Sequence, residues 1–223
     1  MLAQVTTYMQ LWGGDCVFKD IPHSAHEEDT HRRIINAALE EFTHHGFKGT
    51  STRAISERAG VNEVTLFRHF GSKVEMLKEA VEDAVKQMRV PTDIEEYLRL
   101  PFREGFRQLL RDYLMQLTSR SEILMLGMTE SFSHSEVVSS LVLFFSKMRT
   151  LLIYYFEQMH AQGRMKEADY PLLTQAIIST LHATPVMRKR APQEVTSNLT
   201  DDRVLAMLVD LTASAYSLEE QKE

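Results

Sequence analysis

The sequence contains very little cysteine. Cys16 is the only cysteine among 223 residues, so no disulfide can form within the chain. A chain without disulfides suits a reducing compartment, and we therefore expect a cytoplasmic protein. A single thiol can act as a redox sensor, but a lone cysteine near the start of a chain is more often incidental.

Long apolar runs are also missing. No stretch approaches the roughly 20 apolar residues that a helix needs to span a bilayer. The sequence does not begin with basic residues followed by an apolar run, as a secretion signal would. We therefore expect no membrane partner.

The sequence lacks the common signatures of enzymes. It has no glycine-rich phosphate loop and no nucleophile elbow. His23, His26 and His31 lie near acidic residues, but their spacing matches no compact set of metal ligands, and a polar lead-in to a helix explains them more simply. We expect neither an enzyme nor a bound metal or cofactor.

The composition is that of an ordinary globular protein. Apolar residues make up 43% of the chain and charged residues 25%, with a net charge of −6. A chain of this length can hold a small domain and a larger one. Helical periodicity recurs along it, whereas strand-like alternation is missing after Pro91. The pattern predicts an all-α fold of about nine helices, over residues 27–45, 52–58, 62–70, 73–88, 102–118, 122–131, 136–162, 168–188 and 202–217.

Residues 46–76 carry an ordered series of helix start and stop signals. Gly46 follows a helical run, and Ser51 can cap the next helix. Residues 59–61 (Ala-Gly-Val) form a turn, after which Asn62 can cap a second short helix. Ser72, followed three positions later by an acidic residue, forms a capping box that opens another helix. The signals predict two short helices joined by a tight turn, which is the form of a DNA-binding helix-turn-helix.

Local charge supports the same interpretation. Residues 46–73 contain five basic and two acidic side chains, a balance of 5 − 2 = +3, so the rest of the chain carries −6 − 3 = −9. A basic island in an acidic protein suits a polyanion bound at one place, although a solvated helix face is the alternative. The residues counted are Lys48, Arg53, Glu57, Arg58, Glu63, Arg68 and Lys73.

This region resembles the DNA-binding domain of the TetR (tetracycline-repressor) family of bacterial transcription regulators. The resemblance covers roughly residues 28 to 80 and departs at Phe67, where many members have tyrosine and could bond a phosphate through its hydroxyl. Beyond that region only the helical pattern and the length are similar. The residues that carry it are Ala37, Ala38, Phe42, Gly46, Phe47, Thr50, Ser51, Ile55, Ala59, Gly60, Val61, Thr65, Leu66, Phe67, His69, Phe70, Ser72 and Lys73.

The resemblance implies which side chains read bases. Asn62, Glu63, Val64 and Arg68 are expected to face outward on the recognition helix. Arg68 would pair with guanine or phosphate, Glu63 would accept from a cytosine amino group, and Val64 would contact a thymine methyl. For Glu63, stabilisation of the helix dipole near an N-terminus is an equal alternative.

The resemblance also implies phosphate contacts, which fix the register of the protein on DNA without reading sequence. Thr52 is expected to meet a phosphate, and Arg53 to reach phosphate or guanine. Thr65, His69 and Lys73 are expected to hold phosphates on either side of the groove.

We expect three parts in the chain: an N-terminal extension (1–26), a helix-turn-helix domain (27–72), and a linking helix continued by a helical bundle (73–223). The last predicted helix is apolar around much of its circumference, so it needs cover on two sides. Burial within one subunit would provide such cover. The resemblance implies instead a homodimer that pairs its last two long helices and binds a palindromic double-stranded DNA operator.

The bundle is rich in aromatic and methionine residues, which can form either a plain core or an adaptable pocket. The resemblance implies a small apolar or aromatic effector that binds there and releases a repressor from DNA. A helix-turn-helix protein controlled by a protein partner, or one with an architectural role, is the alternative. The candidate ligand contacts are Phe106, Tyr113, Met128, Phe132, Phe145, Met148 and His182.

Overall fold

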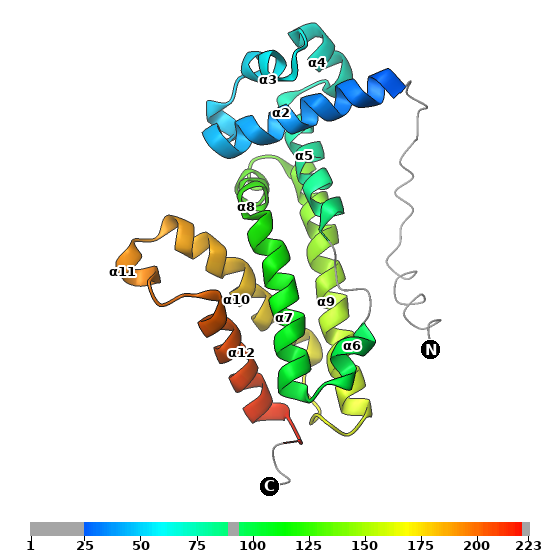
Figure 1. Cartoon of the computed structure of the whole chain (residues 1–223), viewed down its shortest axis with the longest axis vertical. Helices are drawn as coiled ribbons and strands as arrows, with labels where there is room; N and C mark the ends of the chain where they lie inside the picture. The colour runs from blue at the N-terminus through cyan, green and yellow to red at the C-terminus, as the bar shows by residue number, and fades with distance from the viewer. Residues whose placement is uncertain (1–24, 89–93, 220–223) are drawn as a thin grey trace.

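The structure is a computed structural model that describes residues 25–88 and 94–219. Within these ranges the chain forms eleven α-helices, one short 3₁₀ helix and no strand, which confirms the predicted all-α fold (Figure 1). The two helices beyond the predicted nine are short: α6 (Ile94–Arg99) and α11 (Gln193–Thr196). Residues 1–24, most of the expected extension, lie outside the described part. None of the described helices is long and apolar enough to cross a bilayer.

The first described helix, α2 (Ala25–Gly49), supports the N-terminal layer of the molecule, which comprises residues 25–87. Ile35, Ala38 and Phe42 lie on its buried face. The helix was expected to end before Gly46, but a short helical segment continues to Gly49 after a kink. At the kink Gly46 has φ 71° and ψ 170°, a backbone conformation that residues other than glycine rarely adopt.

The next three helices begin at the predicted caps. They are α3 (Thr52–Ala59), α4 (Glu63–Phe70) and α5 (Lys73–Gln87). The Ser51 Oγ accepts a hydrogen bond from the Ala54 amide at 3.1 Å, and the Ser72 Oγ accepts one from the Glu75 amide at 3.1 Å. Each bond satisfies an amide that the helix itself leaves without a partner.

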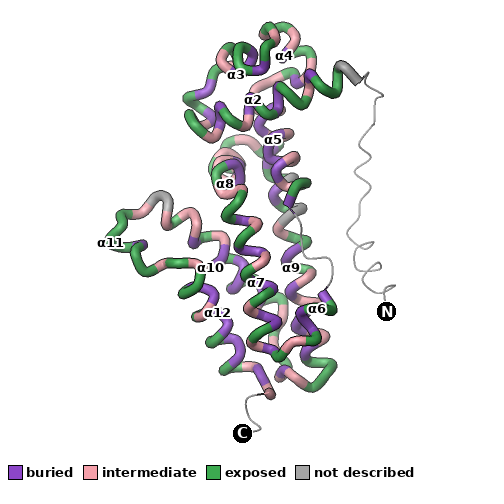
Figure 2. The backbone as a smooth tube through the Cα atoms, in the orientation of Figure 1, coloured by how far each residue is buried: buried purple, intermediate pink, exposed green. Residues whose placement is uncertain are grey.

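The C-terminal layer is a helical bundle with buried and exposed residues interspersed along its helices (Figure 2), and most of its buried residues are apolar. Phe106, Met148, Leu152 and Tyr155 are fully buried in its centre. Gly163, with φ 69°, follows the C-terminal end of α9. The elements of the bundle are α7 (Phe102–Ser119), α8 (Ser121–Glu130), η1 (Ser135–Val137), α9 (Val138–Ala161), α10 (Tyr170–Arg190) and α12 (Asp201–Tyr216).

One arginine holds three chain segments together at the end of the bundle. The Arg164 guanidinium donates to the carbonyl of Leu98, in the last turn of α6, and to that of Leu100, just after the helix. It also forms an ion pair with Glu219. Glu219 in turn accepts from the amide of Phe102 at the start of α7. A cation at the C-terminus of a helix and an anion at the N-terminus of a helix each interact favourably with the helix dipole.

The two layers meet at α8. This helix packs against both α2 and α5, and its Gly127 lies directly on α5. A Cβ atom at Gly127 would come within 3.0 Å of the Val81 side chain, so only glycine allows this spacing without a shift. Beside it, the Phe47 and His134 rings meet edge to face at 5.1 Å. A shift of α8 toward α5 would therefore displace α5.

Candidate nucleic-acid interface and effector cavity

The helix α4 has one buried and one exposed face. Leu66 and Phe70 are buried in the core, whereas Val64 is 78% exposed and Phe67 43% exposed. Arg68 is exposed on the same outward side. Helices α3 and α4 lie together at one end of the elongated molecule, away from α12 (Figure 1). This end therefore presents a short helix with a mixed apolar and basic outer face.

The turn before α4 is fixed by backbone hydrogen bonds and a side-chain cap. Gly60 adopts the left-handed conformation (φ 66°, ψ 37°), and its amide donates to the Glu57 carbonyl. The Asn62 Oδ1 accepts from the Thr65 amide at 2.8 Å. A phosphate only accepts hydrogen bonds, so a phosphate contact by Asn62 would use its side-chain amide nitrogen, which donates.

Thr52 and Glu63 contact each other. The Thr52 hydroxyl donates to the Glu63 carboxylate at 2.7 Å, which joins the first turn of α3 to the first turn of α4. The same hydroxyl cannot donate to a phosphate while this bond exists. The phosphate contact predicted for Thr52 and the base contact predicted for Glu63 stay predictions, and both residues also set the angle between the two helices.

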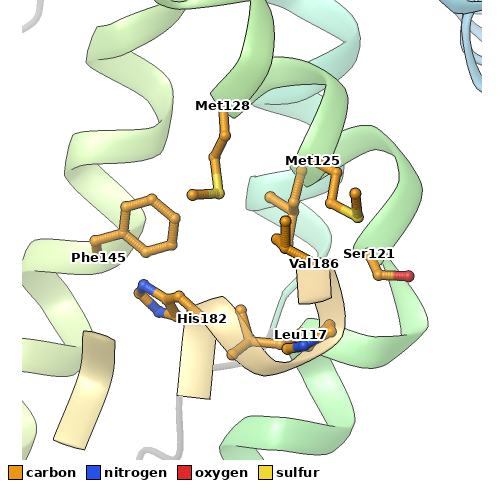
Figure 3. Close-up of a pocket in the computed structure, with 9 residues that line it drawn as sticks. Leu117, Ser121, Met125, Met128, Phe145, His182 and Val186 are labelled. Carbon is orange, nitrogen blue, oxygen red and sulfur yellow. The ribbon is translucent and has the colours of Figure 1, made fainter. Parts of the chain in front are cut away.

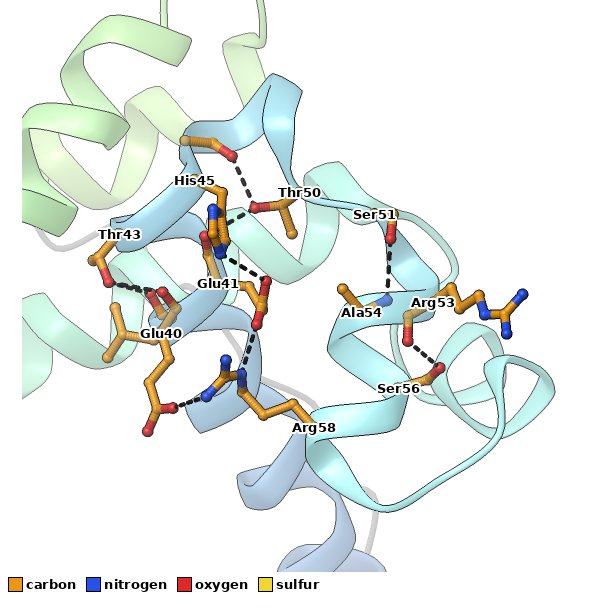
Figure 4. A network of polar contacts seen from close by, with 12 residues as sticks. Glu40, Glu41, Thr43, His45, Thr50, Ser51, Arg53, Ala54, Ser56 and Arg58 are labelled. Atoms are coloured by element: carbon orange, nitrogen blue, oxygen red, sulfur yellow. Dashed lines mark hydrogen bonds and ion pairs between the residues drawn. The ribbon is translucent and has the colours of Figure 1, made fainter.

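The basic side chains of this region differ in their pairing. Arg53 pairs with Glu57 at 2.8 Å along α3, and that hydrogen bond followed by the Glu57 charge raises the pKa of Arg53. Arg58 pairs with Glu41 at 2.6 Å and with Glu40 at 2.8 Å (Figure 4). The hydrogen bond to Glu41 is the main cause of the raised pKa of Arg58.

Arg58 belongs to the predicted basic island, but in the structure it links two helices. Its pairing with Glu41 joins α3 to α2, and Glu41 is buried although it is acidic. Thr50 adds a second link, since its hydroxyl donates to the carbonyl of Glu41. Only the fold brings these residues together, because Arg58 lies 17 positions from Glu41.

Lys73 is half-buried, and its ammonium group is bonded to backbone carbonyls of the protein itself. Its Nζ donates to the carbonyls of Phe47 at 2.8 Å and Thr50 at 2.9 Å, and lies 4.3 Å from the centre of the Phe47 ring. The ammonium thus fastens the α2–α3 connection to the start of α5. The predicted phosphate contact would have to use its remaining N–H.

Replacing Lys73 by methionine is therefore expected to lower both stability and DNA affinity. Loss of hydrogen bonds from a charged donor should lower the free energy of unfolding by about 1.5–3 kcal/mol. Affinity should fall by the same factor for every DNA sequence, because phosphate contacts do not read bases. Urea unfolding and DNA titrations measure the two effects, with the exposed Lys48→Met as the matched control. Unchanged unfolding together with weaker DNA binding would refute the internal role.

Thr65 and His69 are half-buried on the side of α4 that faces α2. The His31 and Phe70 rings stack on each other, and the His69 ring lies beside this pair, with its centre 5.9 Å from that of His31 and 6.2 Å from that of Phe70. Together with Asn62 and Arg68, both residues line a groove between α4 and the start of α2. The groove gives a DNA backbone beside α4 a place to lie, and the phosphate contacts of Thr65 and His69 stay predictions.

Comparison with known proteins identifies the family. Residues 34–80 match the model described as bacterial regulatory proteins, tetR family. The helix-turn-helix of this chain belongs to the TetR family. Its matched segment ends within α5 and includes all of α3 and α4, so the family's DNA-binding helix-turn-helix is the unit described above. TetR-family regulators are DNA-binding proteins rather than enzymes.

Two HTH-type regulators match the chain over segments of different length. The HTH-type transcriptional regulator YvkB of Bacillus subtilis is 26% identical over 152 residues, 67% of this chain and 79% of that protein. The HTH-type regulatory protein RaaS of Mycobacterium tuberculosis is 49% identical over 57 residues, 26% of each chain. The sequence likeness is thus strongest over a short segment.

Solved structures share the fold along nearly the whole chain. The TetR-family regulator PfmR of Thermus thermophilus aligns with a TM-score of 0.60 at 21% identity, over 84% of this chain and 99% of that one. A transcriptional regulator from Rhodococcus sp. Rha1 gives a TM-score of 0.64 at 16% identity, over 83% and 97%. These likenesses show that the C-terminal bundle has a TetR-like fold.

The C-terminal bundle contains a small cavity between α7, α8, α9 and α10. It measures about 20 Å³ and is lined by Met128, Phe145 and His182 among others (Figure 3). Tyr113 reaches this place from α7, because its hydroxyl is hydrogen-bonded to the His182 Nε2. Four of the seven candidate ligand contacts therefore lie at or beside one cavity.

The other three candidates lie elsewhere. Phe106 and Met148 are fully buried in the core, where Phe106 stacks on Tyr155 at 6.0 Å. Phe132 is 93% exposed in the turn after α8, so it cannot line a cavity in this structure, and that expectation was wrong. Leu117, Leu124 and Val186 also line the cavity, although they were not predicted to. Ordinary core residues of this kind give no local signal of a cavity.

Proposed function

We propose that this TetR-family regulator binds a palindromic operator as a homodimer and represses transcription until a small effector releases it. The outward face of α4 carries the proposal, because Arg68 and Val64 are exposed there while Leu66 and Phe70 anchor the helix in the core. A guanidinium can pair with guanine and an isopropyl group can contact a thymine methyl in the major groove. The other assigned DNA contacts are Thr52, Arg53, Asn62, Glu63, Thr65, Phe67, His69 and Lys73.

The decisive experiment is selection of bound sites from random duplexes by the purified chain. We expect an enriched sequence with two-fold symmetry, whose half-sites are separated by one helical turn or a multiple of one, since a dimer presents two recognition helices about 34–36 Å apart. Enrichment without two-fold symmetry would contradict the dimer-operator arrangement. Binding that depends steeply on salt but shows no sequence preference would favour an architectural role.

Exposed apolar stripes on the last two long helices support a dimer. On α10, Leu172 is 67% exposed and Met187 is 45% exposed. On α12, Met207 is 46% exposed and Leu211, four positions later, is 64% exposed. The two helices lie on the same side of the bundle (Figure 1). Exposed apolar residues on two helices at the same side of the bundle are the kind of surface that a second subunit would cover.

The substitution Leu211→Glu is expected to produce monomers at micromolar concentration. A glutamate placed in an apolar interface would lose its hydration without gaining a partner. Light scattering measures the mass, and Val195→Glu is the matched control, because Val195 is 61% exposed on α11, outside both stripes. Dimers that survive Leu211→Glu, or a monomeric unsubstituted chain, would refute this interface.

A route for effector control runs through α8. The inner side of this helix contributes Leu124, Met125 and Met128 to the cavity, while Gly127 packs on Val81 of α5. Expansion of the cavity would press α8 against α5 and change the spacing of the two recognition helices. A ligand that favours the displaced state by about 1–3 kcal/mol would weaken operator binding roughly 5- to 150-fold.

One observation favours the alternative of control by a protein partner. The cavity of about 20 Å³ is far smaller than the roughly 300–1,000 Å³ typical of ligand sites. An effector would therefore have to open it. Thermal-shift screening against hydrophobic compounds separates the two possibilities, because control by a protein partner predicts no stabilising compound.

A further inference from the structure

The cavity between α7, α8, α9 and α10 is lined by uncharged side chains. Leucine, methionine, valine, proline and phenylalanine make up most of its wall, and Ser121 and His182 are the polar residues among those described as lining it. No aspartate, glutamate, lysine or arginine is among those lining residues. The wall therefore offers an ionic ligand no opposite charge.

A polar pair lies at one side of this wall. The Tyr113 hydroxyl and the His182 Nε2 are hydrogen-bonded to each other, and the Phe145 ring lies 4.2 Å from the imidazole, measured between ring centres. Burial lowers the pKa of His182 to about 4, and burial also raises the pKa of Tyr113. Both groups are therefore neutral near pH 7, and together they offer hydrogen-bond donors and acceptors without charge.

The surroundings of the pair can open. Met125 and Met128 are only half-buried, and the unbranched thioether chain of methionine adapts easily to new shapes. Pro185 also lines the cavity, inside α10. Since proline has no amide N–H, the Leu181 carbonyl cannot receive the usual helical bond from it, and the helix is easier to bend there.

We propose that the cavity opens to bind an uncharged, largely apolar molecule whose single hydroxyl or carbonyl group hydrogen-bonds to Tyr113 and His182. This inference rests on the proposed function, since it specifies the chemical class of the effector. A charged ligand would lose its hydration in an uncharged cavity. A hydrocarbon would fill the space but gain no hydrogen bond.

Calorimetric titration of the full chain with four matched probes tests the class. The probes are 4-propylphenol, propylbenzene, 4-propylbenzoate and 4-propylbenzylamine, which share one apolar body and differ in the attached group. We expect 4-propylphenol to bind about 2- to 10-fold more tightly than propylbenzene, as one neutral hydrogen bond allows. The anion and the cation should bind at least about 10-fold more weakly than the phenol.

The substitution Tyr113→Phe identifies the site. It removes the hydroxyl and should abolish the preference for 4-propylphenol over propylbenzene, whereas general loss of packing would weaken both probes alike. Tyr170→Phe, at the start of α10 and outside the cavity lining, is the matched control and should keep the preference.

Three results would overturn the inference: no binding of 4-propylphenol up to its solubility limit, equal or tighter binding of a charged probe, or an unchanged preference in Tyr113→Phe. Operator release is measured separately, by titrating the same probes into the protein–DNA complex. A neutral probe that binds with the expected preference but leaves operator affinity unchanged would defeat effector control while the site chemistry stands.

Discussion

Replacing Arg68 by alanine is expected to reduce affinity for the selected operator by about 5- to 150-fold per half-site, since one bidentate arginine–guanine pair provides about 1–3 kcal/mol of discrimination. Arg68 is exposed on α4 and lines the groove beside it. The ion pairs described on this surface join Arg53 to Glu57 and Arg58 to Glu40 and Glu41, so Arg68 takes part in neither. Fluorescence anisotropy with the operator and its single-base variants measures the loss.

The pattern of the loss separates base reading from phosphate binding. If Arg68 reads a base, the variant should lose preference at one position in each half-site and bind random DNA almost as before. Arg111→Ala removes the same charge from an exposed arginine on α7, where it pairs with Asp202, and should change neither property. An Arg68→Ala variant with unchanged operator affinity and preference would refute the role of α4 as the reading element.

Replacing Gly105 by alanine is expected to lower the free energy of unfolding by about 1–3 kcal/mol, as overpacking of a filled core does. A Cβ atom at Gly105 would lie 2.2 Å from the Tyr97 carbonyl oxygen and 3.2 Å from the Tyr155 hydroxyl. The carbonyl belongs to the backbone of α6 and cannot rotate away. The short helix would have to move off α7 and strain the Tyr97–Asp112 hydrogen bond, which measures 2.7 Å.

Thermal unfolding provides the measurement for Gly105→Ala. For a chain of this size, each kcal/mol of destabilisation corresponds to a decrease in Tm of about 2–4 °C. Gly49→Ala is the matched control, because its Cβ would meet only the His45 Cβ at an ordinary 3.6 Å. If both variants melted at the temperature of the unsubstituted chain, α6 could not pack against α7 as closely as described.

The helix boundaries of the N-terminal layer could be predicted because their causes are local. Ser51, Asn62 and Ser72 each bond an amide three positions ahead, and Gly60 forms the turn that it alone accommodates easily. Two short helices were missed. The α6 helix has only six residues and the α11 helix only four, which is too short for periodicity to appear.

Predictions for individual site residues depended more on the fold. Val64 and Arg68 are exposed as their helical positions predicted. Lys73 proved to be bonded to Phe47 and Thr50, which are 26 and 23 positions away in the chain. Phe132 was assigned to a pocket from its residue type, but the turn after α8 leaves it in solvent. Residue type therefore predicts which chemistry is available, but not where long-range packing places it.

The all-α architecture and the two short helices of the helix-turn-helix could be predicted from the sequence, because caps, turns and periodicity act over a few residues, and the resemblance indicated the family of the DNA-binding unit. Three other features depend on the folded chain. Folding pairs Thr52 with Glu63, ties Arg58 to Glu41, and places the Tyr113–His182 pair beside an uncharged cavity. Each of these joins residues on different helices, and their distance is fixed by core packing that no local pattern records.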